Sequence, residues 1–215
     1  MSRGPCCLTR SGAALPVRKP PGRYERRDHS GEGEREGEEK LSLGFDPAFI
    51  SACTFSHMSG LTFRTPTEQD YPDVLEALDT WWGDVGGAEG GTERARLLPR
   101  LFFQHFTDTS VVVEDQDVIV AFLIGFLSQS RTDQAYIHFV GVAPTHQRRG
   151  IAKDLYRYFC DTARRHGRRS VHAITSVSNA TSQDFHRHMG FKVSDPVTNY
   201  DGRGGDRVTF ALQLS

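Results

Sequence analysis

Two spacings of apolar residues alternate along the chain after Leu61, and they predict a domain that mixes helices and strands. Apolar residues three to four positions apart favour helices over 68–82, 94–106, 151–166 and 180–189. Alternating or continuous apolar runs favour seven strands: LTFRT, SVVVED, VIVAFLIGFLS, AYIHFVGVAP, SVHAITSVS, FKVS and DRVTFALQL. The predicted order is therefore β-α-α-β-β-β-α-β-α-β-β, with SVVVED and VIVAFLIGFLS joined as an antiparallel pair by a short turn at Gln116 and Asp117.

Residues 1–57 lack both spacings. The stretch PVRKPPGRYERRDHSGEGEREGEEK is rich in Pro, Gly, Arg and Glu, and it buries too little to offset the entropy lost on ordering. We expect residues 1–57 to form a disordered or poorly ordered extension and residues 58–215 to form one domain of ordinary size.

Charge and cysteine usage narrow the classes of function. The 215 residues carry a formal net charge of -1, whereas a dedicated nucleic-acid-binding protein would show a basic excess. No stretch reaches the ~18 apolar residues of a membrane span, and the first thirty residues lack the apolar core of a signal peptide. The four cysteines show neither CxxC spacing nor a disulfide framework. We expect a cytoplasmic protein without a metal, a nucleic-acid partner or a membrane partner.

The stretch VAPTHQRRGIAKDLYRYF places two arginines directly before a predicted helix. A helix start already carries partial positive charge from its unpaired backbone N–H groups, so arginines there oppose the helix dipole. A tight turn with Gly150 ahead of a helix is a natural anion site, because neighbouring backbone N–H groups converge on the ligand. Gln147, Arg148 and Arg149 would add donors around that anion. Taken alone, the turn leaves open a purely structural role for the glycine.

Two motifs together resemble the GNAT superfamily of N-acetyltransferases. VAPTHQRRGIA matches its acyl-CoA loop, [RQ]-x-x-G-x-[GA] after a strand that ends in V-x-P, through Gln147, Gly150 and Ala152. NATSQDFHRHMGF resembles the family's later motif, an Asn that opens a helix closing in a Gly-Phe pair. The resemblance implies an α/β (α+β) fold. Its mixed, mostly antiparallel central sheet would have six to seven strands, be splayed at the middle and be flanked by about four helices.

The same resemblance implies acetyl-CoA as the acyl donor. Backbone N–H groups of the turn would hold its pyrophosphate, with the arginine side chains near the phosphates. Backbone groups at the end of the preceding strand would pair with the pantetheine arm as an added strand would, and Asn179 would bind that arm from the opposite side. The expected cofactor-binding residues are Val142, Ala143, Gln147, Arg148, Arg149, Gly150, Ile151, Ala152 and Asn179.

The implied reaction is direct attack of an amine on the thioester, with the backbone N–H of Val142 as oxyanion donor. His138 stands where many relatives carry a glutamate, so it is the expected general base, and a packing role is its alternative. His186 stands where relatives most often have a tyrosine. It would share the Asn179 face of the helix and donate a proton to the departing thiolate, unless the acid is missing.

The implied acceptor is a primary amine of a small molecule or peptide. The region from Asp79 to Phe106 corresponds to the part of the relatives that forms one wall of the acceptor site. Adjacent Trp81 and Trp82 cannot both face inward on a helix, so we expect one to meet solvent or substrate. A non-catalytic acyl-CoA sensor or a degenerate partner subunit is the alternative function, and a homodimer is compatible with the sequence.

Overall fold

The computed structural model describes residues 60–82 and 96–215, and these residues belong to one compact unit. The extension predicted for residues 1–57 lies outside the described residues. The strands are β1 (Leu61–Arg64), β2 (Val111–Asp115), β3 (Val118–Leu127), β4 (Gln134–Val142), β5 (Ser170–Ser176), β6 (Lys192–Val193) and β7 (Arg207–Gln213). The helices are α2 (Tyr71–Trp82), α4 (Leu101–His105), α5 (Ile151–Arg165) and α6 (Ala180–His188), with short 3-10 turns η1 (Glu68–Asp70), η3 (Thr107–Thr109) and η4 (Pro144–His146).

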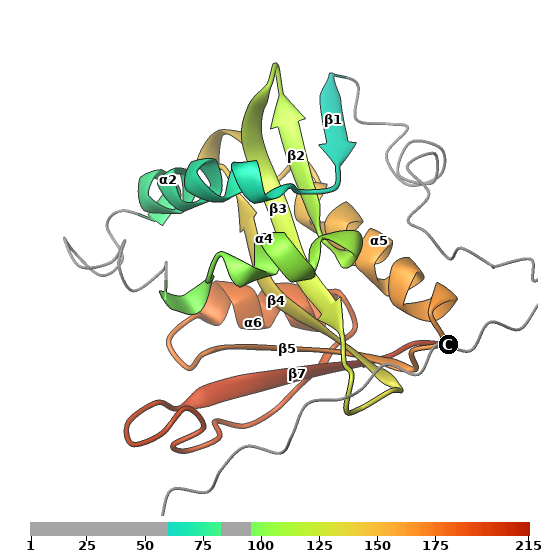
Figure 1. Cartoon of the computed structure of the whole chain (residues 1–215). Coiled ribbons are helices and arrows are strands. Elements are labelled where there is room, and N and C mark those ends of the chain that lie inside the picture. Colours follow the sequence, from blue (N-terminus) through green and yellow to red (C-terminus); the bar gives the residue numbers. More distant parts are fainter. Residues whose placement is uncertain (1–59, 83–95) are drawn as a thin grey trace, which may run out of the picture. The chain divides into compact units, whose positions relative to one another are not determined.

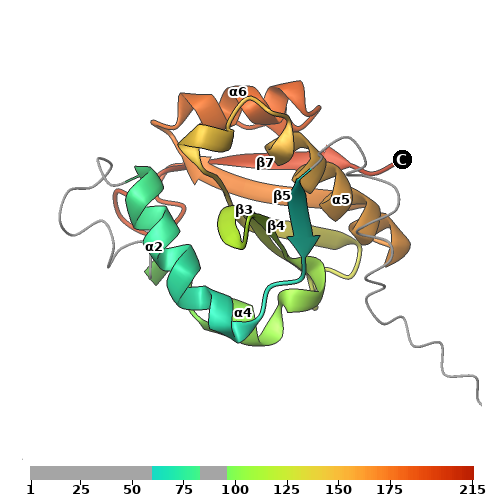
Figure 2. The same ribbon diagram turned by 90° about the horizontal axis from the view of Figure 1, so that it is seen from above.

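The seven strands form one sheet in the order β1-β2-β3-β4-β5-β7-β6 (Figure 1). Every neighbouring pair is antiparallel except β4 and β5, which run parallel. Figure 2 shows α2 and α4 on one side of the sheet and α5 and α6 on the other. The predicted mixed, mostly antiparallel sheet with four flanking helices is therefore confirmed.

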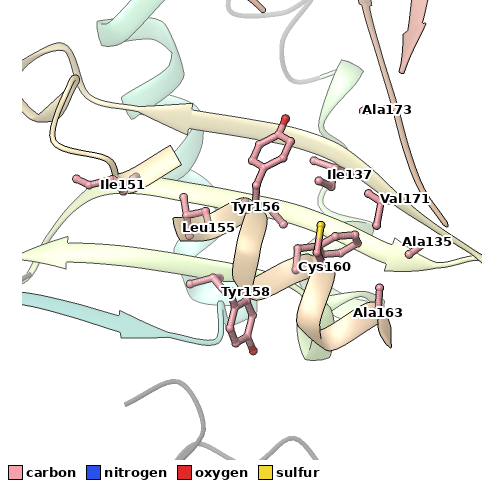
Figure 3. Packing of buried hydrophobic residues seen from close by; sticks show 14 of the residues in the cluster. Ala135, Ile137, Ile151, Leu155, Tyr156, Tyr158, Cys160, Ala163, Val171 and Ala173 are labelled. Atoms are coloured by element: carbon pink, nitrogen blue, oxygen red, sulfur yellow. The ribbon is translucent and has the colours of Figure 1, made fainter. Parts of the chain in front are cut away.

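Helix α5 carries the apolar face that its spacing predicts. Ile151, Leu155, Phe159 and Ala163 are all buried against the sheet, because residues four apart share one side of a helix. Tyr156 and Tyr158 point to opposite sides of the helix (Figure 3). Both tyrosines are nevertheless buried, so α5 is covered on more than its sheet-facing side.

The helix predicted over 94–106 is interrupted. In the described part of this segment, Arg96 and Leu97 are helical, the helix breaks over residues 98–100, and α4 begins at Leu101. Pro99 explains the difference, because proline has no N–H and disfavours a helical conformation at the residue before it. The N–H groups of Phe102 and Phe103 instead donate to the carbonyls of Pro99 and Arg100, at 3.1 and 2.9 Å.

The two tryptophans at the end of α2 both pack on the sheet, and neither is fully buried. The ring centroid of Trp81 lies 5.9 Å from that of Phe122, and the centroid of Trp82 lies 5.8 Å from that of Phe139. Adjacent helical residues are about 100° apart, which lets both flank one helix–sheet contact.

The sheet opens between its two central strands. β4 pairs with β5 only through Gln134–Tyr136 and Ser170–His172, although both strands continue beyond this contact. Figure 1 shows β5 and β7 running across the direction of β2 and β3. The predicted splay is therefore present, and within residues 60–82 and 96–215 no strand pairs with the β5 side of β4 from Ile137 to Val142.

Candidate active site

The basic turn links β4 to α5 through two left-handed residues. Arg148 has a φ of 62° and Gly150 a φ of 88°, and the second of these is a conformation that glycine adopts without strain. Gly150 occupies the N-cap and brings no side chain to satisfy the helix start. The first helical N–H to bond inside α5 is that of Asp154, which donates to the carbonyl of Gly150 at 3.1 Å. The preceding N–H groups, which include those of Ile151 and Ala152, therefore have no acceptor within the helix.

The exposed side chains of Arg148 and Arg149 add positive charge to this helix start. An anion placed here would receive backbone donors, the positive end of the helix dipole and two guanidinium groups. The geometry thus agrees with an anion site at the turn.

The end of β4 presents backbone groups to the open edge of the sheet. The N–H of Ala143 donates to the carbonyl of Val120 at 2.8 Å, so it points toward β3. Because successive residues of a strand point their backbone groups to opposite edges, the N–H of Val142 points toward the splay. The carbonyl of Val142 accepts a hydrogen bond from Nε2 of Gln147 at 3.3 Å. Of the two residues expected to bind the pantetheine arm, Val142 has the better placed donor.

Asn179 lies at the start of α6, where its side chain has a local partner. Its Oδ1 accepts a hydrogen bond from the N–H of Ser182 at 3.0 Å, which caps the helix. Residue 179 is exposed, and capping engages only the oxygen of its amide. The amide nitrogen is the group that a ligand in the splay would meet.

His186 does not share the exposed surroundings of Asn179. Its side chain is 4% exposed, and the ring stacks on Phe210 at a centroid separation of 3.7 Å. Nε2 lies 3.0 Å from the hydroxyl of Tyr156, and Nδ1 lies 2.7 Å from the carbonyl of Ser182. A carbonyl only accepts, so Nδ1 carries the proton and Nε2 accepts from Tyr156.

Burial lowers the pKa of His186 to about 4, although the hydrogen bond to Ser182 opposes this shift. The ring is therefore neutral at neutral pH. This corrects the expectation of an imidazolium that faces the cleft. Helical spacing places residues 179 and 186 on one side of α6. Spacing alone does not reveal that this side is exposed at residue 179 and buried at residue 186.

Tyr156 is the partner that the sequence did not indicate. Its spacing on α5 is that of a core residue, and it lies thirty positions before His186. No local pattern connects two such positions, so only the packing of α5 against α6 reveals the pair.

His138 lies at the irregular point of β4. Ile124 pairs with Phe139 and Gly125 pairs with Ile137, so His138 is the extra residue of a β-bulge. Its ring stacks on Phe102 of α4 at a centroid separation of 4.2 Å. A bulge at this position re-aims the side chain toward the helices above the sheet.

The environment of His138 fixes its tautomer. Nε2 lies 2.6 Å from the carbonyl of Leu97, so Nε2 donates and Nδ1 has the lone pair. Burial lowers the pKa of this ring below its ordinary value, while the hydrogen bond to Leu97 acts in the opposite direction. The site thus contains a neutral imidazole with an oriented acceptor nitrogen, which is the state that a general base requires.

Two further properties concern only residues 60–82 and 96–215. In these ranges no group of three or more His, Cys, Asp or Glu side chains could hold a metal ion. No helix in the same ranges has the length and apolar character needed to cross a membrane.

Comparisons with known proteins agree with the motifs. A family model described as the acetyltransferase (GNAT) family matches residues 72–191, which is more than half of the chain. L-2,4-diaminobutyric acid acetyltransferase of Shouchella clausii is 30% identical over 86 residues. This match covers 40% of the chain and spans about half, 48%, of that curated relative.

Solved structures share the fold. Diaminobutyrate acetyltransferase EctA from Paenibacillus lautus, solved with L-2,4-diaminobutyric acid and coenzyme A, has a TM-score of 0.54 at 24% identity. That likeness covers 72% of the chain and 95% of EctA. The protein yncA from Salmonella typhimurium, solved with its cofactor acetyl-CoA, has a TM-score of 0.54 at 20% identity and covers 73% and 95% of the two chains. At these identities the likeness concerns the fold alone.

Proposed function

The chain belongs to the GNAT acetyltransferase family, and from this premise we propose that it transfers an acetyl group from acetyl-CoA to a primary amine of a small molecule or peptide. The observation that supports the proposal most is the splay of β4 from β5, which ends at the left-handed turn before α5. An open strand edge that leads directly into an anion site suits a ligand with an extended amide arm and a pyrophosphate.

The cofactor would lie along this line. The turn from Gln147 to Ala152 would hold the pyrophosphate, and Val142 with Ala143 would meet the pantetheine arm opposite Asn179. The structures of yncA with acetyl-CoA and of EctA with coenzyme A support this choice of cofactor.

The chemistry would be direct attack in a ternary complex. The neutral amine nitrogen attacks the thioester carbon, and Nδ1 of His138 takes the proton that this nitrogen loses, directly or through one water molecule. The N–H of Val142 donates to the oxyanion that forms. Collapse of that intermediate breaks the carbon–sulfur bond, and the thiolate takes its proton from water, since His186 is neutral and buried.

A small amine is the preferred acceptor class. The relatives named for L-2,4-diaminobutyric acid support it, because that compound carries primary amines on a small carbon chain. A cytoplasmic location, a domain that begins near residue 58 and a homodimer stay predictions from the sequence.

The test is an acceptor screen that follows release of the coenzyme A thiol and product mass together. Polyamines, aminoglycosides, amino acids and peptides with free N-termini are each offered with acetyl-CoA. Thiol release that depends on the amine, with a product heavier by one acetyl group, is the expected result. Binding of acetyl-CoA without turnover on any amine would contradict the proposal.

That second outcome is what the alternative function predicts. A non-catalytic acyl-CoA sensor or degenerate subunit would bind acetyl-CoA in the same splay. The observation that favours it is the buried, neutral His186 at the position where a proton donor is expected.

A further inference from the structure

The side chains of Tyr136 and Arg207 lie on the same face of the sheet as His138. Directly paired residues of neighbouring strands share a face, and residues two apart on one strand do so as well. Tyr136 pairs with His172 of β5, and His172 pairs with Ala211 of β7. Arg207 lies four residues before Ala211 on β7, so its side chain shares the face of Tyr136.

A row of ring contacts connects Tyr136 to the proposed base. The ring centroid of Phe126 lies 5.5 Å from that of Tyr136, on which it stacks, and 6.2 Å from that of Phe102, to which it is tilted. Phe102 in turn stacks on His138. The opposite face of β7 is turned toward α6, where Phe210 meets His186. Tyr136, His138 and Arg207 therefore belong to one face of the sheet, the face that α4 contacts.

The loop that leads into β7 has a fixed shape. Asn199, Gly202 and Gly204 all have left-handed backbone conformations. The side chain of Asn199 accepts from the N–H of Gly204 at 2.9 Å, and that of Asp206 accepts from the N–H of Asn199 at 2.8 Å. These hydrogen bonds fix the loop conformation. Asp201 of the same loop accepts a hydrogen bond from Arg207.

Among the described residues, Asp201 engages Nε of Arg207 and leaves the other edge of the guanidinium available. Nε of Arg207 donates to Oδ2 of Asp201 at 2.6 Å, and the two side chains are 27% and 41% exposed. A guanidinium has a second edge, formed by its two terminal nitrogens, that matches the two oxygens of a carboxylate. The contact with Asp201 orients that edge, because it restricts rotation of the side chain.

Tyr136 supplies a further donor on the same face of the sheet. Burial raises the pKa of its hydroxyl to about 12, with smaller effects from Tyr200 and Asp201, and Arg207 acts in the opposite direction. The hydroxyl therefore keeps its proton at neutral pH and can donate it in a hydrogen bond.

We propose that Arg207, oriented by Asp201 and assisted by the hydroxyl of Tyr136, binds a carboxylate of the acceptor while His138 receives the proton of its amine. The acceptor is thus an amino acid or a similar amine with a free carboxylate. This inference rests on the proposed function, since it concerns the acceptor side of that same site.

The test compares acceptors that differ only in the carboxylate. L-2,4-diaminobutyrate is paired with 1,3-diaminopropane, L-ornithine with 1,4-diaminobutane, and single amino acids with their amides. We expect kcat/KM to favour the carboxylate member by at least about tenfold, because a site built to bond a group rejects an analogue that lacks it. In Arg207→Gln the preference should fall to about twofold or less, through a higher KM for the carboxylate member and an unchanged KM for acetyl-CoA.

Arg203→Gln is the matched control, because Arg203 is an exposed arginine of the same loop. Its preference should equal that of the unaltered protein. If Arg207→Gln does not fold, Arg207→Lys serves instead. Lysine keeps the positive charge but lacks the pair of terminal nitrogens that bonds both oxygens of a carboxylate. The Lys variant should therefore lose most of the preference for the carboxylate member.

Each other outcome overturns the inference. An unaltered protein that acetylates amines without preferring the carboxylate member, or an Arg207 variant that keeps the preference, contradicts the carboxylate site while the proposed function stands. A protein that acetylates no amine contradicts the proposed function itself, and the carboxylate site falls with it.

Discussion

The hydroxyl of Tyr156 donates to Nε2 of His186 across 3.0 Å, and this hydrogen bond joins α5 to α6 inside an aromatic core. α5 begins at the basic turn, and α6 begins at Asn179. The pair therefore connects the two helices whose starts would hold the pyrophosphate and the pantetheine arm of the cofactor. Its contribution is to position these helices, since neither group is exposed.

Removing one partner of this pair should destabilise the protein more than removing both. His186→Phe leaves the Tyr156 hydroxyl buried without its acceptor, at a cost of about 1–3 kcal/mol in the free energy of unfolding. The double variant with Tyr156→Phe should lose less than the sum of the single losses. Urea unfolding of all four proteins measures the coupling. Strict additivity would show that the hydrogen bond contributes nothing.

The same variant should keep most of its activity. Removing a positioned proton donor typically lowers the rate by more than about tenfold, and in the proposed mechanism the thiolate takes its proton from water. The kcat of His186→Phe should therefore fall by less than about tenfold.

The stability of the protein should depend on pH through His186. The unfolded imidazole binds a proton near pH 6.5, whereas the folded one does so near pH 4, because burial disfavours the charged ring. Between these values the unfolded state holds more protons, so stability falls as the pH falls, by up to on the order of 3 kcal/mol. Unfolding of the unaltered protein and of His186→Phe is compared from pH 7 to pH 4. The two stability curves should converge toward acid, and parallel curves would contradict the lowered pKa.

His138 should govern the acid limb of the rate. A base must be unprotonated, so kcat/KM should fall as the pH drops through the pKa of His138, which burial places below 6.5. His138→Gln should lower kcat/KM by about 10²–10⁴-fold and remove that limb. His172→Gln is the control, since His172 also has a pKa lowered by burial and shares the sheet face. If the acid limb of kcat/KM disappears in His172→Gln and persists in His138→Gln, the general base is a residue other than His138.

The turn before α5 should be sensitive to negative charge. Gly150→Glu puts a carboxylate at the proposed pyrophosphate site and a side chain at a left-handed backbone position. Affinity for acetyl-CoA, measured by calorimetry, should fall below detection. Gly150→Asn is the matched variant, because asparagine tolerates this conformation and adds no charge. It should retain most of the affinity, and similar losses in both variants would indicate backbone strain as the cause.

The sequence by itself determined the order of the elements, the glycine turn before α5 and the family resemblance. These features are local: apolar spacing sets helices and strands, and a glycine before a helix start depends on its neighbours alone. The cause of the break before α4 is also local, since Pro99 stands inside the segment predicted as one helix.

Only the tertiary structure decided what surrounds each side chain. His186 occupies the expected helix position, but the ring that covers it, Phe210, and the hydroxyl that it accepts from, Tyr156, come from other elements. His138 acquires its tautomer from Leu97, and Arg207 comes to share a surface with Tyr136 through two strand registers. Spacing along a chain contains no information about these distances. The pKa and the orientation of a group follow from burial and partners, and folding alone brings those partners together.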